Sequence, residues 1–187
     1  MIIIRIIIIN YIIISLYHSY KNMSCDKNTC EYKCVDEVLH IIYKKEIPKY
    51  INDIANKYEG DISDRIGINF PMSFFEGICK DCKDIKNNIV FKCCEIMKYK
   101  DSTKYVVVYK KGDKITKDHE LLHAKYYIDE NYKKKIQLIW ENMNKENKKK
   151  VVNMLKKMGY PEKEEIMIDE FQAYYYTEKP NFFGKKI

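Results

Sequence analysis

Residues 118–127 read DHELLHAKYY and hold two of the four histidines in this 187-residue chain. His119 and His123 are four positions apart, so on a helix they differ by about 40° and lie on one face. Their imidazoles can then reach a single ion at the short distances that zinc requires. Glu120 is rotated to the side of that line, where its carboxylate can deprotonate a water that the metal has made more acidic. The stretch therefore predicts a metal-binding active-site helix.

The other side of this helix is apolar. Leu121, Ala124 and Ile128 fall opposite the histidines and would bury the helix against a core. The helix thus combines a polar face that water can reach with an apolar face that packs in the core, as metal-assisted hydrolysis needs. The pattern H-E-x-x-H is short and also arises by chance, in which case the histidines are ordinary surface residues.

Two histidines alone make a weak metal site, so a third ligand is a stricter test than the H-E-x-x-H pattern itself. Asp129 follows His123 by six residues, the offset at which metzincin peptidases carry their third ligand. Those enzymes turn the chain at a glycine three residues after the second histidine, and this chain has Tyr126 there. The helix is therefore expected to continue and to carry Asp129 about 9 Å along its axis, out of reach. Glu170 is the acid that we favour, because the small Ala173 one turn later lets its helix approach closely. The alternative is an exposed acid on an amphipathic helix.

These residues carry a family resemblance. HELLH at 119–123 together with DEFQA at 169–173 resembles the zincin metallopeptidases in their gluzincin arrangement. The resemblance covers roughly residues 104–178 and has moderate specificity, because the first motif is short. It implies zinc as the cofactor, with Glu120 as the general base. The zinc ligands that it implies are His119, His123 and Glu170.

The resemblance also implies an edge strand before the active-site helix, along which the backbone of a peptide or protein substrate pairs. KYVVVYK at 104–110 is in the right place for it. No downstream histidine suits stabilisation of the oxyanion, so that role falls to a tyrosine. Tyr174 shares the face of Glu170, whereas Tyr126 and Tyr127 flank the histidines. Asp169 could orient a ligand through a hydrogen bond, or be an ordinary acid of the helix surface.

The rest of the chain predicts an α+β fold in a single zincin-like domain. It combines N-terminal helices, a β-hairpin or small sheet, the H-E-x-x-H helix and a C-terminal helix that carries the third ligand. The motif helix is expected to begin near Thr116 or Asp118, both good N-caps. The predicted helices are at about 34–42, 48–60, 136–143, 151–158 and 163–178, and the one at 151–158 is either separate or a continuation of the one before it. The predicted hairpin joins 89–99 to 104–110, and residues 61–88 are expected to be loop with at most one short strand.

The first 22 residues form a hydrophobic leader, which we treat apart from the domain at 23–187. Its apolar stretch at 6–16 is shorter than the ~20 residues that span a bilayer, and Arg5 interrupts the run. Three interpretations stay open: Met23 is the true start, the leader is a signal or membrane anchor, or it is a buried strand. A membrane partner is expected only if the leader is real. Otherwise the protein is expected in the cytoplasm, including that of a host cell, rather than secreted.

The seven cysteines are not spaced like those of a small secreted scaffold, which favours a reducing compartment. Four of them could form a second, structural zinc site or be small buried hydrophobes: Cys79, Cys82, Cys93 and Cys94. The net charge of +7 comes from lysines that we expect to be solvated, and gives no specific signal for nucleic acid.

Three functions therefore remain. The leading hypothesis is a zinc-dependent hydrolase that cleaves peptide bonds. The second is a basic, zinc-stabilised module that binds nucleic acid or protein, and the third is a zincin fold that has lost catalysis and serves as an interaction protein.

Overall fold

A four-stranded mixed sheet organises the part of the chain that the structure, a computed structural model, describes: residues 30–60, 62, 65–81 and 96–184. Its strands are β1 (Cys30–Val35), β2 (Val38–Tyr43), β3 (Ile68–Pro71) and β4 (Tyr105–Lys110), in the order β1-β2-β4-β3. β2 and β4 pair in parallel, and each outer strand pairs antiparallel with its inner neighbour. The fold is thus α+β, as predicted.

The helix predicted at 34–42 is wrong, because this segment turns from β1 into β2. Asp36 and Glu37 both have positive φ angles, as a two-residue hairpin turn of type I′ requires. The apolar spacing that suggested a helix belongs to an inner strand that is buried on both faces. Such a strand has no polar side, so its periodicity does not distinguish it from a helix.

The strand predicted at 104–110 is confirmed as β4, but the described residues before it do not form the partner strand of the predicted hairpin. Residues 89–95 lie outside the described part of the chain, and those that follow form a helical turn and the short 3-10 helix η1 (Lys100–Ser102). β4 pairs with β2 and β3 instead, so it is an inner strand and not the edge strand expected at 104–110. The edge next to the active-site helix is β3, within the segment expected to be mostly loop.

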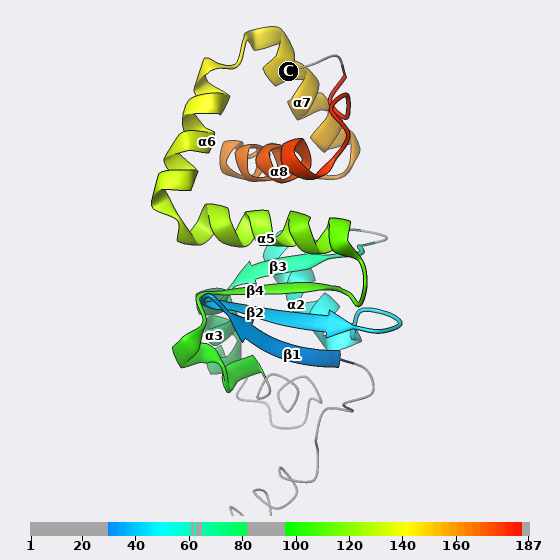
Figure 1. The fold of residues 1–187 in the computed structure, drawn as a ribbon, viewed down its shortest axis with the longest axis vertical. Coiled ribbons are helices and arrows are strands. Elements are labelled where there is room, and N and C mark those ends of the chain that lie inside the picture. The colour runs from blue at the N-terminus through cyan, green and yellow to red at the C-terminus, as the bar shows by residue number, and fades with distance from the viewer. Residues whose placement is uncertain (1–29, 61, 63–64, 82–95, 185–187) are drawn as a thin grey trace, which may run out of the picture.

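Helices cover both faces of the sheet (Figure 1). One face packs against α2 (Lys49–Glu59), the helix predicted at 48–60, and against α3 (Met72–Asp81). The expectation of loop at 61–88 is therefore wrong over α3. The other face contributes four buried side chains that pack against Ala124 of α5 (Lys114–Ile128); they are Val38, Tyr105, Val107 and Tyr109. Leu121 and Ile128 flank that contact, so the apolar back predicted for the motif helix is confirmed.

Three further helices form a second core on the far side of α5: α6 (Glu130–Asn142), α7 (Lys145–Lys157) and α8 (Glu164–Thr177). All three were predicted near these positions. Trp140, Leu155 and Phe171 are fully or nearly fully buried between them. α8 lies alongside α5 on the side away from the sheet (Figure 1). α5 is therefore held between a sheet and a helical layer.

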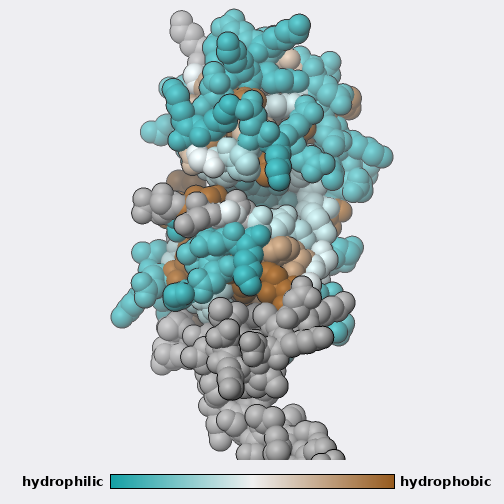
Figure 2. All heavy atoms as spheres, turned by 180° about the vertical axis from the view of Figure 1, so that it is seen from behind, coloured by the Kyte–Doolittle hydropathy of each residue, from teal (hydrophilic) through white to brown (hydrophobic). Residues whose placement is uncertain are grey.

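The surface over the helical layer is predominantly hydrophilic (Figure 2). Lys134, Lys135, Lys149 and Lys150 are exposed there, as expected for solvated lysine runs. Among the described residues, no helix has both the length and the apolar character needed to cross a bilayer.

Candidate metal centre

The site begins with the cap of α5. The carboxylate of Asp113 accepts hydrogen bonds from the backbone N–H and the hydroxyl of Thr116, which satisfies free donors at the start of the helix. The helix therefore begins at Lys114, and the expectation of Thr116 or Asp118 as the cap is wrong. From this start, α5 presents His119, Glu120 and His123 to a pocket of about 310 Å³.

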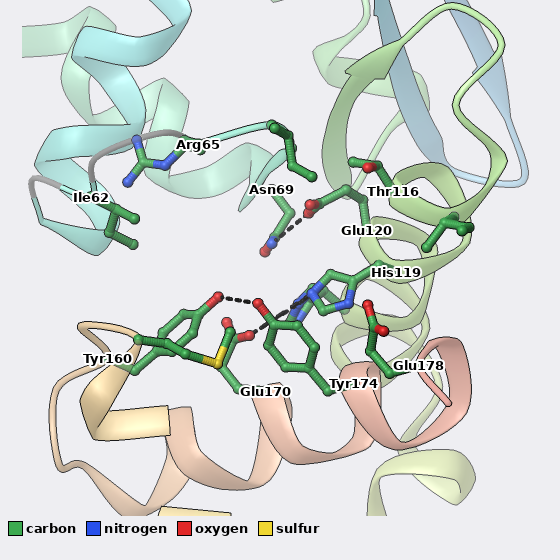
Figure 3. A pocket seen from close by; sticks show the side chains of 15 residues that line it. Ile62, Arg65, Asn69, Thr116, His119, Glu120, Tyr160, Glu170, Tyr174 and Glu178 are labelled. Atoms are coloured by element: carbon green, nitrogen blue, oxygen red, sulfur yellow. Dashed lines mark hydrogen bonds and ion pairs between the residues drawn. The ribbon is translucent and has the colours of Figure 1, made fainter. Parts of the chain in front are cut away.

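The pocket lies between α5 and α8. In Figure 3, Asn69 and Glu120 form one wall, while Tyr160, Glu170 and Tyr174 form the opposite wall. Glu170 comes from α8, so the two histidines and this acid reach the same space from separate helices.

The three expected zinc ligands converge. One nitrogen of each histidine and one carboxylate oxygen of Glu170 all lie within 4.8 Å of one another. The Nε2 atoms of His119 and His123 are 3.2 Å apart. Oε2 of Glu170 lies 3.9 Å from Nε2 of His119 and 3.8 Å from Nε2 of His123. Tetrahedral zinc with bonds of about 2.0–2.2 Å holds its ligands roughly 3.3–3.6 Å apart. The donor set thus fits a tetrahedral ion after shifts of a few tenths of an ångström.

His119 is oriented by Thr177 of α8. The Thr177 hydroxyl donates its proton to the carbonyl oxygen of Ala173 at 2.7 Å, and its oxygen lies 3.3 Å from Nδ1 of His119. Because that proton is already used, the hydroxyl can only accept at Nδ1. His119 therefore carries its hydrogen on Nδ1 and keeps the Nε2 lone pair toward the ligand cluster. Burial, and then the charge of His123, lower the pKa of His119 to about 3.

His123 is oriented by Asp169, the residue before Glu170. Its Nδ1 lies 2.9 Å from a carboxylate oxygen of Asp169, an ion-pair distance, although the N–H does not point straight at that oxygen. Burial opposes the charged form, but the carboxylates of Asp169 and Glu170 outweigh it and raise the pKa of His123 well above its usual value. Asp169 thus contacts His123 at Nδ1, the nitrogen that faces away from the ligand cluster, as one interpretation of the sequence proposed.

Glu120 is nearly enclosed, with 5% of its surface exposed. Oε2 accepts a hydrogen bond of 2.8 Å from the side-chain amide of Asn69, on the edge strand β3. Oε1 rests against Gly67, where an added Cβ would overlap it. Burial raises the pKa of Glu120 to about 7, although the charge of His123 and the Asn69 hydrogen bond oppose the shift. A carboxyl group with this pKa exchanges protons easily near neutral pH.

Two tyrosines complete the opposite wall. The hydroxyls of Tyr160 and Tyr174 are 3.0 Å apart, and the Tyr174 ring lies edge-on to His119 with centroids 4.5 Å apart. Burial, offset in part by the hydrogen bond with Tyr160, raises the pKa of Tyr174 to about 12, and burial also raises the pKa of Tyr160. Both hydroxyls therefore stay protonated near neutral pH. One of the two protons is used in the hydrogen bond between them, which leaves one O–H to donate elsewhere.

Other candidates from the sequence lie elsewhere. Asp129 caps α6 by accepting from the N–H groups of Asn131 and Tyr132. Tyr126 is buried in the helical core, and Tyr127 packs on Tyr105. The side chains of the four cysteines proposed for a second zinc site lie outside the described part of the structure: Cys79, Cys82, Cys93 and Cys94.

Sequence reasoning missed several residues of the pocket: Arg65, Gly67, Asn69 and Tyr160. Three of them lie in or just before β3, so recognising that short strand would have brought them next to the motif helix. Tyr160 lies in the connection between α7 and α8, where no pattern in the sequence marks it.

Comparisons with known proteins found no relative of this chain. No protein-family model matches the chain, no curated protein matches it, and no solved structure matches it.

Proposed function

We propose that this chain is a zinc-dependent peptidase of the zincin type. The observation that carries the proposal is the convergence of His119, His123 and Glu170 from two helices, with Glu120 in the same pocket. Histidine pairs on helices are common, but this pair has a third donor close enough to share one ion with both imidazoles. It also has a polar partner behind each imidazole.

Zinc is the ion that suits the donors. Two imidazoles and one carboxylate with nearly tetrahedral spacing are typical of catalytic zinc sites, in which a fourth position stays open. When bound, the ion would supply Lewis acidity that polarises a carbonyl group and makes a water more acidic.

Glu120 would carry the proton. Its carboxylate takes a proton from the water whose oxygen attacks the carbonyl carbon of the substrate. When the C–N bond breaks, Glu120 returns that proton to the leaving nitrogen and is ready for another turnover. Its raised pKa, about 7, supports this role, because both protonation states are accessible near neutral pH.

One hydroxyl of the Tyr160–Tyr174 pair would stabilise the negative charge that develops on the carbonyl oxygen. The two hydroxyls lie in the pocket opposite Glu120 and bond to each other, so one O–H of the pair is left to donate (Figure 3). Hydrogen-bond donors that are held in place before the reaction can stabilise an oxyanion without having to reorganise.

The substrate would be an extended peptide. β3 is the sheet edge beside the pocket, and it contributes Asn69 to the pocket lining. A peptide that adds to this edge as a further strand would bring its backbone past Glu120. This assigns to β3 the substrate-pairing role that we expected at 104–110.

The test is hydrolysis of a quenched fluorescent peptide library by the zinc-loaded protein. Glu120→Gln should lower the rate by about 10²–10⁴-fold and leave the zinc content at one per chain. Glu141→Gln, an exposed acid on α6, is the control and should retain full activity. Activity that persists in Glu120→Gln would exclude Glu120 as the base.

The same preparations test the alternatives. Zinc binding without cleavage of any peptide would favour the inactive interaction protein. Zinc that is lost on replacing Cys82 but kept on replacing His123 would favour the cysteine-based binding module.

A further inference from the structure

We propose that Asn69 is the positioning residue of Glu120, and that Tyr105 fixes Asn69 in the orientation this requires. The inference rests on the proposed function, because Glu120 has a proton to carry only in a hydrolase. It extends the site from α5 into the two neighbouring strands, β3 and β4.

The three side chains form a buried chain of hydrogen bonds. The Tyr105 hydroxyl donates to Oδ1 of Asn69 at 2.6 Å, and Nδ2 of Asn69 donates to Oε2 of Glu120 at 2.8 Å. All three residues are at least 92% buried. They come from three elements, β4, β3 and α5, so the chain ties the active-site helix to the sheet beneath it.

The direction of these bonds follows from what each group can do. An ionised carboxylate only accepts, so the amide must turn its NH₂ group toward Glu120. Its oxygen then points away and needs a donor, which the phenol of Tyr105 provides. Without this phenol, the amide could rotate and place its oxygen against the carboxylate.

Gly67 restricts the carboxylate from another side. A Cβ at this position would overlap Oε1 of Glu120 and crowd its Cδ atom and a methyl group of Thr116. The backbone just before β3 thus approaches the carboxylate closely at one oxygen, while Asn69 holds the other. The two contacts leave Glu120 little freedom to rotate away from the pocket.

A purely structural role would not need these groups. Apolar side chains of similar size would pack between the sheet and α5 at no cost in unsatisfied polar atoms. A buried polar chain that ends on the candidate base is better explained by the geometry it imposes there.

The first experiment compares kcat with KM in four variants of the zinc-loaded protein: Asn69→Ala, Asn69→Asp, Tyr105→Phe and Tyr109→Phe. Asn69→Asp keeps an acceptor for Tyr105 but removes the donor to Glu120. Tyr109→Phe is the matched control, because its hydroxyl also makes a buried hydrogen bond on β4, to Nδ1 of His40, away from the pocket.

Both Asn69 variants should lower kcat by roughly 10–100-fold, while KM and the zinc dissociation constant stay within about twofold. Tyr105→Phe should give a smaller loss in kcat, and Tyr109→Phe none. Parallel changes in kcat, KM and zinc affinity would overturn the proposal, because they would mean that Asn69 only maintains the fold. An unchanged kcat in Asn69→Ala would overturn it as well.

A second experiment does not depend on hydrolysis. The unfolding equilibrium of the zinc-loaded protein is measured for Asn69→Ala, Glu120→Ala and the double variant. Non-additivity of about tenfold in the equilibrium constant would establish the hydrogen bond, even if no peptide is cleaved and the proposed function fails. Additive effects would remove the physical basis of the proposal.

Discussion

Nδ1 of His119, on α5, lies 3.3 Å from the hydroxyl oxygen of Thr177, the last residue of the facing helix α8. The hydroxyl donates to a backbone carbonyl of its own helix, so it can only accept from the imidazole. One threonine thereby determines which nitrogen of His119 is free for a metal. The contact also joins the two helices that carry the candidate ligands.

Replacing Thr177 with valine should therefore weaken zinc binding. The side chain keeps its shape but loses the acceptor, so the imidazole tautomer and its orientation are no longer held. We expect the zinc dissociation constant to rise roughly 10–100-fold, as measured by competition with a chelating dye. Thr103→Val is the control, because Thr103 makes a similar hydroxyl-to-carbonyl hydrogen bond, to Tyr99, remote from the pocket. Equal zinc affinities in all three proteins would contradict the tautomer argument.

Removal of one ligand should abolish tight zinc binding. His123→Ala or Glu170→Ala leaves two donors, whereas Glu165→Gln, an exposed acid in the first turn of α8, leaves the cluster intact. The wild type should bind one zinc per chain and gain about 2.7 kcal/mol of stability at a free zinc concentration 100 times the dissociation constant. Metal analysis and thermal unfolding with and without chelator measure both effects. One tightly bound zinc in both ligand variants would place the ion elsewhere.

Zinc affinity should rise with pH. The carboxylates of Asp169 and Glu170 keep the pKa of His123 well above its usual value in the metal-free protein, so a proton must leave before Nε2 can bind an ion. Below that pKa, the apparent association constant should increase about tenfold per pH unit, and above it the increase should stop. Calorimetry in two buffers with different ionisation enthalpies counts the released protons. An affinity that stays flat between about pH 6 and 8 would show that His123 is already neutral.

Gly67→Ala should impair catalysis more than folding. The new methyl group would overlap Oε1 of Glu120, so either the carboxylate or strand β3 must shift. We expect kcat to fall by at least about tenfold while zinc content stays at one per chain. Gly77→Ala in α3 is the matched control: a Cβ there meets nothing within 4 Å, and a helix favours alanine by about 0.5–1 kcal/mol. A Gly67→Ala enzyme with normal kcat would mean that the backbone at Gly67 does not confine Glu120.

Most of the described helices were predicted because their signals are local, although α3 lies in a segment expected to be loop and the helix expected at 34–42 is absent. Pro48 and Gly60 flank α2, and the apolar spacing of the later segments matches α6, α7 and α8. The strands were predicted poorly because pairing joins residues far apart in sequence. β2 is buried on both faces, so its pattern resembles a helix, and the turn before it uses Asp36 and Glu37 rather than glycine.

The residues of the candidate site also fall into two groups, those that could be predicted from the sequence and those that could not. The spacing of His119 and His123, and the identity of Glu170 as the third donor, could be reasoned from the sequence because each depends on the faces of single helices. Asn69, Gly67 and Tyr160 could not, because they reach the pocket only through the strand order and through the connection between α7 and α8.

The sequence by itself determined that one helix would carry two imidazoles and a carboxylate on its polar side, since 3.6 residues per turn allow no other arrangement. Tertiary structure alone decided that α8 lies close enough for Glu170 and Thr177 to meet His119, and that β3, not β4, forms the edge beside Glu120. The reason is physical: helical periodicity is set by bonds between near neighbours, whereas the packing of α5 between sheet and helices depends on the whole chain.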